Sequence, residues 1–255
     1  MTVPERSEGA EQPGGRIVPA ATVVPLRDGD EGIEVLLLRR NSGGAFGGMW
    51  VFPGGQVDLA DIEEAGGSAG ASNVQDAFTP GGGTSVEIEA ARRAAVREAR
   101  EEAALHLDRS ELVTLSFWLP PAEAPRRFAT WFFLAPAGGE IVIDRGEIHD
   151  HRWMAPAEAM AARDRGEIEL APPTFTTLWW LSHRDDVKAA LSDAGEREPE
   201  RFETKVALNA SGQLAATLWS GDAGYADGDL HRPGPRRRLW MLPDGWRVEV
   251  RPDGD

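Results

Sequence analysis

The strongest structural signal in the sequence is the segment 83–105, GTSVEIEAARRAAVREAREEAAL. Ala, Arg and Glu dominate it, and neither Gly nor Pro follows Gly83, so we expect one long helix. Thr84 or Ser85 is expected to cap its start. Small apolar residues recur every three or four positions and predict a narrow stripe that packs on a core: Ile88, Ala91, Ala95 and Ala99.

Three glutamates share one face of this expected helix, because Glu98, Glu101 and Glu102 are spaced by three and four residues. Like charges this close repel one another unless a cation compensates. Arg93 and Arg97 can supply part of that charge, and Mg²⁺ prefers oxygen ligands and accepts several carboxylates. A solvated, salt-bridged helix face is the ordinary explanation of a bare E-x-x-E-E, so the wider spacing must decide.

That wider spacing resembles a known motif. Gly83 is followed by five residues, Glu89, seven residues and then REAREE at 97–102. This pattern resembles the Nudix box, G-x5-E-x7-R-E-U-x-E-E-x-G-U. The resemblance implies that the three glutamates hold Mg²⁺ or Mn²⁺ and take part in catalysis. It also implies that Arg97 belongs to the catalytic set and fixes the carboxylate rotamers.

Two residues depart from the family pattern. Ala99 stands where the family prefers a larger aliphatic residue, which thins the core contact. Ala104 stands where the family has Gly, so we expect the helix to end without a left-handed residue and to run on to His106.

A second candidate for the box glycine lies upstream. In the family the box glycine follows an F-P-G-G like Phe52–Gly55 directly, and the first box glutamate comes six residues later. Six residues after Gly55 stands Asp61, and six after Gly83 stands Glu89. Gly55 and Gly83 therefore both remain candidates for the box glycine.

We interpret residues 56–82 as an insertion that splits the box. The segment is rich in Gly, Ala, Ser and acids and is predicted to be a mobile loop. Its acids Asp58 and Asp61 either face the site or are solvated, and the sequence favours neither. The split box narrows the resemblance to the branch that contains coenzyme A diphosphatases, and further matches occur at 36–61, 125–133, 147, 153–156 and 171–174.

The resemblance implies further site residues outside the helix. Glu147 is the candidate for an additional metal-binding or basic carboxylate, and an exposed turn acid is the alternative. Arg39, Arg40, Arg126 and Arg127 are candidates for binding substrate phosphates, although surface arginines are common. Gly54 and Gly55 are assigned to the substrate site, and Gly55 also to the metal. His149 and His151 would share one strand face and could ligate a metal, but without a third ligand nearby polar strand-edge residues are the favoured interpretation. Arg236–Arg238 are likewise expected to form a solvated strand edge.

The expected fold is the α/β/α sandwich of the Nudix family, with a mixed, curved sheet between the box helix and residues 174–194, and with a β-rich C-terminal extension. The expected organisation is a disordered leader at 1–15, a Nudix hydrolase domain at 16–195 and an extension at 196–255. Expected strands are 17–26, 33–40, 50–52, 111–119, 127–135, 140–144, 202–209, 213–219, 236–242 and 246–251. A short helix is expected at 156–165, and the helix at 174–194 is expected to break near Ser182.

Composition limits the function. A net charge of −15 argues against binding nucleic acid by bulk electrostatics. The absence of cysteine excludes disulfides, thiol nucleophiles and Cys-ligated zinc, and favours the cytoplasm. No apolar run reaches the roughly 20 residues that cross a bilayer, so no membrane partner is expected. No P-loop motif occurs.

The function expected from these features is a divalent-metal-dependent diphosphatase. Its substrate would be a nucleoside diphosphate linked to another moiety, and the branch resemblance favours coenzyme A or an acyl-CoA. ADP-ribose, NADH and dinucleotides are alternatives, as is a non-catalytic Nudix-fold module that binds a nucleotide. A homodimer is compatible with the sequence.

Overall fold

The computed structural model describes residues 16–43, 46–67, 74 and 81–252. The expected leader at 1–15 and most of the second half of the expected insertion lie outside these residues. The main body contains β1 (Ile17–Gly29), β2 (Gly32–Arg40), β3 (Trp50–Val51), β4 (Gly54–Gln56), α1 (Leu59–Glu64), α3 (Ser85–Ala103), the 3₁₀ turn η1 (Arg109–Glu111), β5 (Val113–Leu119), β6 (Arg127–Pro136), β7 (Ile148–Met154), α4 (Pro156–Asp164), α5 (Pro172–Leu181), α6 (Val187–Gly195) and β8 (Glu200–Glu203). A smaller unit follows with β9 (Lys205–Leu208), β10 (Leu214–Leu218), β11 (Arg236–Leu242) and β12 (Gly245–Arg251).

The main sheet is mixed and curved, as the sequence predicts. Its strand order is β3-β2-β1-β6-β5-β8, with β4 added to β1 and β7 added to β2. The long strand β1 runs parallel to β6 and antiparallel to both β2 and β4, which pair with different parts of it. One strand therefore carries both the N-terminal hairpin and the short strand β4.

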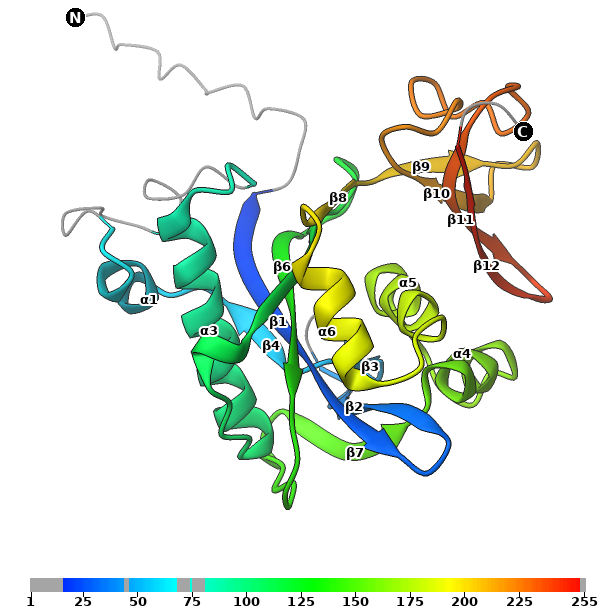
Figure 1. Cartoon of the computed structure of the whole chain (residues 1–255). Coiled ribbons are helices and arrows are strands. Elements are labelled where there is room, and N and C mark those ends of the chain that lie inside the picture. Colours follow the sequence, from blue (N-terminus) through cyan, green and yellow to red (C-terminus); the bar gives the residue numbers. More distant parts are fainter. Residues whose placement is uncertain (1–15, 44–45, 68–73, 75–80, 253–255) are drawn as a thin grey trace, which may run out of the picture.

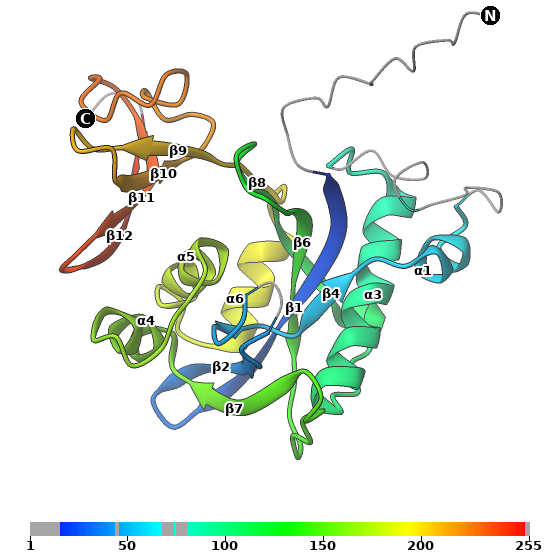
Figure 2. The ribbon, with the colours of Figure 1, turned by 180° about the vertical axis from the view of Figure 1, so that it is seen from behind.

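Two apolar layers cover the two faces of this sheet. On one face α3 packs its alanines against inward side chains of β1 and β6, and on the other α4, α5 and α6 enclose a larger aromatic core. Figure 1 shows α3 on one side of the strands and α4, α5 and α6 opposite it. Figure 2, seen from behind, shows α1 beside α3. The predicted α/β/α sandwich is confirmed, and the predicted break near Ser182 separates α5 from α6.

The box helix, predicted within residues 83–105, forms as α3. Thr84 caps its start by accepting a hydrogen bond from the N–H of Glu87. Ala91, Ala95 and Ala99 are fully buried, and two neighbouring alanines widen the stripe. The expected end was wrong. The helix ends at Ala103, and Ala104 itself takes the left-handed conformation with φ 52° and ψ 25°.

The left-handed Ala104 gives a stability prediction. Because a β-carbon disfavours this conformation and glycine is free of that penalty, we expect Ala104→Gly to raise the free energy of unfolding by about 1 kcal/mol. The matched control is Ala161→Gly at an exposed position inside α4, which should lower it by about the same amount. Urea unfolding of both variants checks the signs, and a loss of stability in Ala104→Gly would contradict the prediction.

Two strand predictions were wrong. Residues 140–144 form no strand, because the segment instead runs beside the end of α3, where the N–H groups of Val142 and Asp144 bond to carbonyls of Ala103 and Glu102. Conversely, no strand was expected at Gly54–Gln56, which forms β4. Glycine makes this possible, because a β-carbon on Gly54 would collide with the backbone of β1 at Ala21.

The C-terminal segment divides between two sheets. The expected strand 202–209 is interrupted at Thr204: β8 pairs in parallel with β5 in the main sheet, and β9 begins a separate sheet of order β12-β11-β10-β9. Arg238 on β11 corrects another expectation. Its side chain is fully buried rather than solvated, in an ion pair with Asp222. Among the described residues, no helix combines the length and apolar character needed to cross a membrane.

Candidate functional site

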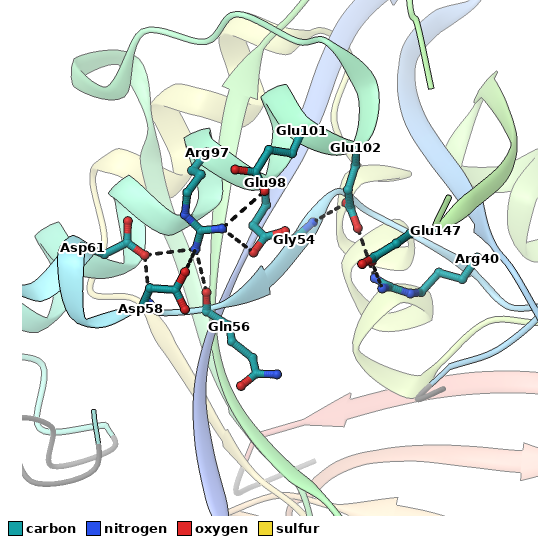
Figure 3. A network of polar contacts seen from close by, with 10 residues as sticks. All are labelled: Arg40, Gly54, Gln56, Asp58, Asp61, Arg97, Glu98, Glu101, Glu102 and Glu147. Atoms are coloured by element: carbon teal, nitrogen blue, oxygen red, sulfur yellow. Dashed lines mark hydrogen bonds and ion pairs between the residues drawn. The ribbon is translucent and has the colours of Figure 1, made fainter. Parts of the chain in front are cut away.

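The candidate site lies where α3 crosses the short strand β4. Figure 3 shows the glutamates of α3 reaching toward Gly54 and Gln56 on one side and toward Arg40 on the other. The three glutamate side chains differ in exposure: Glu102 is 5% exposed, Glu98 17% and Glu101 60%. The helix therefore presents two largely buried carboxylates and one open to solvent.

Gly55 determines how closely Glu98 approaches the sheet. A β-carbon at this position would lie 2.7 Å from Glu98 Oε2 and closer still to the carboxyl carbon. No side chain larger than hydrogen fits unless the carboxylate moves. The next glycine also contributes, because the N–H of Gly54 donates to Glu102 Oε2 over 3.0 Å. The two glycines thus seat two of the three carboxylates against β4.

Arg97 is the centre of the ion-pair network. Its guanidinium donates to Glu98 Oε1 at 2.8 Å, to Asp61 Oδ2 at 3.0 Å and to the carbonyl of Gln56 at 2.9 Å, and Glu101 lies at 3.6 Å. Asp61, at the start of α1, is buried and also accepts from the N–H of Asp58. The arginine is held by the segment after β4, and it holds Glu98 in turn.

The two candidates for the first box acid make different contacts. Gly55 and Asp61 contact Glu98 and Arg97 directly. Glu89 instead pairs with Arg93 and Arg109, away from the three glutamates. Residues 55–61 and 97–102 therefore lie together in the fold, whereas Glu89 lies apart from the three glutamates. The six-residue spacing from Gly55 to Asp61 is the sequence signal that would have identified the pair.

The insertion and the arginines near the motif also differ from expectation. The part expected to be a mobile loop contains the helix α1, and residues 68–73 and 75–80 lie outside the described part. Asp61 faces the site, whereas Asp58 is mostly exposed and lies 3.5 Å from Arg97. Arg93 was expected to offset the three glutamates, but it pairs with Glu64 and Glu89.

Arg40 joins the helix to a second acidic group. Its guanidinium bonds to Glu102 Oε1 at 3.1 Å and to Glu147 Oε2 at 2.8 Å. Glu147 directly precedes β7 and its side chain is 63% exposed, so it lies at the open side of the site. The sequence candidates Arg40 and Glu147 are thus brought together with Glu102, whereas Arg39 alternates to the other side of β2.

Two sequence candidates lie apart from this network. Arg127 begins β6 and donates to the carbonyl of Pro120, so it holds the turn between β5 and β6. Arg126 is exposed beside it. Of the histidines before α4, His149 is exposed and His151 half-buried on β7. Neither contributes to a metal-binding group in the part of the chain that the structure describes.

Burial changes the acidity of the network. It raises the pKa of Glu102 to about 7, against the lowering effects of the Gly54 N–H and of Arg40. It also raises the pKa of Glu98, in spite of the hydrogen bond from Arg97. Burial lowers the pKa of Arg97, but hydrogen bonds to Asp61 and Glu98 outweigh it and the pKa ends above its ordinary value. The neighbouring arginines therefore do not fully offset the cost of burying the negative charges of Glu98 and Glu102.

Glu102 gives a pH-dependent stability prediction for the metal-free protein. Because its folded-state pKa lies above the ordinary 4.5, the folded state binds more protons than the unfolded state between these values. The free energy of unfolding should therefore fall as pH rises through this window. Relative to wild type, Glu102→Gln should gain about 2 kcal/mol of stability between pH 5 and pH 8. Urea unfolding in EDTA checks it, and parallel pH profiles would contradict it.

The donor set suits a hard divalent cation. Six carboxylates in Figure 3 surround two guanidiniums, those of Arg40 and Arg97. Oxygen ligands and excess negative charge are what Mg²⁺ and Mn²⁺ require. As placed, the side chains bond to the arginines, and no group of three His, Asp or Glu among the described residues surrounds one point. Glu98, Glu101 and Glu102 are the residues that would hold the ion.

Comparison with known proteins agrees with this geometry. The family model of the NUDIX domain matches residues 68–174, which include α3 and Glu147. A crystal structure of a NUDIX hydrolase from Alicyclobacillus acidocaldarius superposes with a TM-score of 0.56 at 24% identity, covering 70% of this chain and 96% of that one. This likeness concerns the fold.

The curated relative is "Putative nudix hydrolase 7" of Caenorhabditis elegans, 27% identical over 169 residues. The alignment covers 60% of this chain, which spans 57% of the relative's length. The fold is the α/β/α sandwich of the Nudix type. Over residues 68–174 the chain is similar to the NUDIX domain family.

Proposed function

We propose that the protein is a hydrolase that cleaves a phosphoanhydride bond of a nucleotide conjugate with the help of Mg²⁺ or Mn²⁺. The observation that carries the proposal is the placement of the carboxylates of α3 beside Gly54 and Gly55, where Glu102 is buried and Glu98 is 17% exposed. A bound divalent ion would polarise the diphosphate and acidify an attacking water.

The residues of the chain have separate parts in this proposal. Glu98, Glu101 and Glu102 provide the oxygen ligands. Arg97, fixed by Asp61, is a positioning residue that holds Glu98. The water oxygen forms a bond to phosphorus, its proton passes to a carboxylate, and the bridging oxygen leaves with its electron pair on the other phosphate.

Glu147 is the proposed proton acceptor because it is exposed at the open side of the site and is oriented by Arg40. Arg40 lies between two acids and is the candidate to bind a substrate phosphate there. Arg39, Arg126 and Arg127 remain candidates for more distant groups of the substrate. Gly55 remains a candidate for metal binding through its backbone.

The proposed substrate is coenzyme A or an acyl-CoA, supported by the split motif and by the sequence matches around residues 36–61. ADP-ribose, NADH and diadenosine polyphosphates are the alternatives. Mass spectrometry of products after incubation with Mg²⁺ or Mn²⁺ separates them. Formation of 3′,5′-ADP and phosphopantetheine from coenzyme A supports both chemistry and substrate.

The other outcomes are equally informative. Cleavage of ADP-ribose or NADH alone keeps the chemistry and rejects coenzyme A. If neither metal supports cleavage of any compound, a nucleotide-binding module without catalysis takes the place of the enzyme. A cytoplasmic location and a homodimer remain predictions from the sequence, and analytical ultracentrifugation tests the second.

A further inference from the structure

A cavity of about 310 Å³ lies on the face of the main sheet opposite α3. Its wall combines β5, α5, β8 and the C-terminal sheet, which Figure 1 shows beside α5. The cavity is therefore separate from the carboxylates of the candidate site. Its volume is at the lower end of small-molecule sites, which span roughly 300–1,000 Å³.

The wall is aromatic. Trp118 stacks on Phe202 with 4.0 Å between ring centroids, and Trp219 meets both rings edge-on. Trp179 and Trp180 of α5 contribute two further indoles. Walls built of aromatic rings favour a flat ring as the occupant, because it can meet them by offset stacking or edge contacts.

The same wall contains polar atoms without partners. Trp180 Nε1, Trp219 Nε1 and Thr176 Oγ1 are buried, and none has a hydrogen bond within the part of the chain that the structure describes. A buried donor left unsatisfied is destabilising. Two of the three groups can only donate, so a hydrogen-bond acceptor is the kind of group that would satisfy them.

The charge of the wall is opposite to that of the protein. Three arginines and one glutamate line it, in a chain of net charge −15. Arg184 is committed to Asp193 and to the carbonyl of Trp180. Arg197 is the least engaged: its guanidinium lies 4.7 Å above the ring of Trp180 and 3.5 Å from Glu200. It is the cation best placed to accept an anionic group.

We propose that this cavity binds a small planar aromatic anion, with its ring among the tryptophans and its carboxylate or phosphate at Arg197. The proposal does not depend on the activity proposed for the α3 site. Aromatic carboxylates and purine nucleotides share this chemistry. The probes 2-naphthoate and AMP represent the two sources.

Tryptophan fluorescence of the full chain in EDTA tests the proposal, because four of its nine tryptophans line the cavity. We expect saturable quenching by 2-naphthoate, by AMP or by both, and at least tenfold weaker binding of neutral 2-naphthamide. Arg197→Gln should weaken binding at least tenfold, and Arg197→Lys should restore part of it. The matched control is Arg165→Gln, which removes the same charge from an exposed arginine paired with Glu167.

Three results would overturn the proposal. The first is no saturable quenching by either probe at millimolar concentration. The second is equal affinity in wild type and Arg197→Gln, with thermal unfolding showing that both are folded. The third is binding that Glu98→Gln abolishes and Arg197→Gln leaves intact, since this would place the probe at α3.

Discussion

Replacement of Glu98 or Glu102 by glutamine is expected to lower kcat on the cleaved substrate by about 10²–10³-fold while the protein stays folded. Glutamine keeps the size of the side chain and an oxygen acceptor, so Gly54 N–H retains a partner at Glu102→Gln. The variant loses the charge that a divalent ion requires. Steady-state kinetics with Mg²⁺ or Mn²⁺, beside thermal unfolding, measures both effects.

Glu89→Gln is the matched control for this experiment. Glu89 lies on the same helix and carries the same charge, but it contacts Arg93 and Arg109 outside the site. Its activity should remain within about twofold of wild type. Equal losses in all three variants would mean that the acidic helix acts through stability alone, and unfolding of the two site variants would assign Glu98 and Glu102 a structural role.

Arg238→Met is expected to destabilise the protein by about 3–5 kcal/mol, because it leaves the carboxylate of Asp222 buried without its cation. The guanidinium donates to both carboxylate oxygens at 2.7 and 2.6 Å and to the carbonyl of Leu230, and neither side chain of the pair is exposed. Burial raises the pKa of Asp222, but hydrogen bonds from Arg238, Arg237 N–H and Gly224 N–H outweigh it and lower the pKa below its ordinary value.

Urea unfolding measures this loss. Arg247→Met, on the exposed side of the neighbouring strand β12, is the control and should change stability by no more than about 0.5 kcal/mol. The double variant Arg238→Met with Asp222→Leu should recover part of the loss, since it removes the unpaired charge. A loss below about 1 kcal/mol in Arg238→Met would show that the pair contributes little.

Most of the fold could be predicted from the spacing of apolar residues and from the residues that start or end helices and form turns. The box helix, the hairpin of β1 and β2 and the short helix α4 follow from local patterns: alanines at helical spacing, the turn at Asp28-Gly29-Asp30 and the proline at the start of α4. These features depend on residues close together in the chain. They could be read without knowing what packs against them.

Features that depend on residues far apart in the chain could not be predicted from the sequence. Ala104 adopts a left-handed conformation that its own propensity disfavours, at the point where the chain leaves α3 and where residues 142–144 bond to the last helix carbonyls. Arg238 looks solvated in an Arg-Arg-Arg run until Asp222 is placed beside it. The same holds for the candidate site. The spacing of the glutamates could be seen in the sequence, whereas the hydrogen bond between Asp61 and Arg97 could be seen only in the folded structure.

Asp61 and Arg97 are 36 positions apart, yet each is held by its own element: Asp61 by α1 and the pairing of β4 with β1, Arg97 by α3. The length of the connection between α1 and α3 therefore does not set the distance between these two side chains. Loop-closure entropy grows with the logarithm of length, so doubling such a connection costs only about 0.6 kcal/mol. We therefore expect this connection to accept changes in length, including an inserted foreign segment, without movement of the carboxylates.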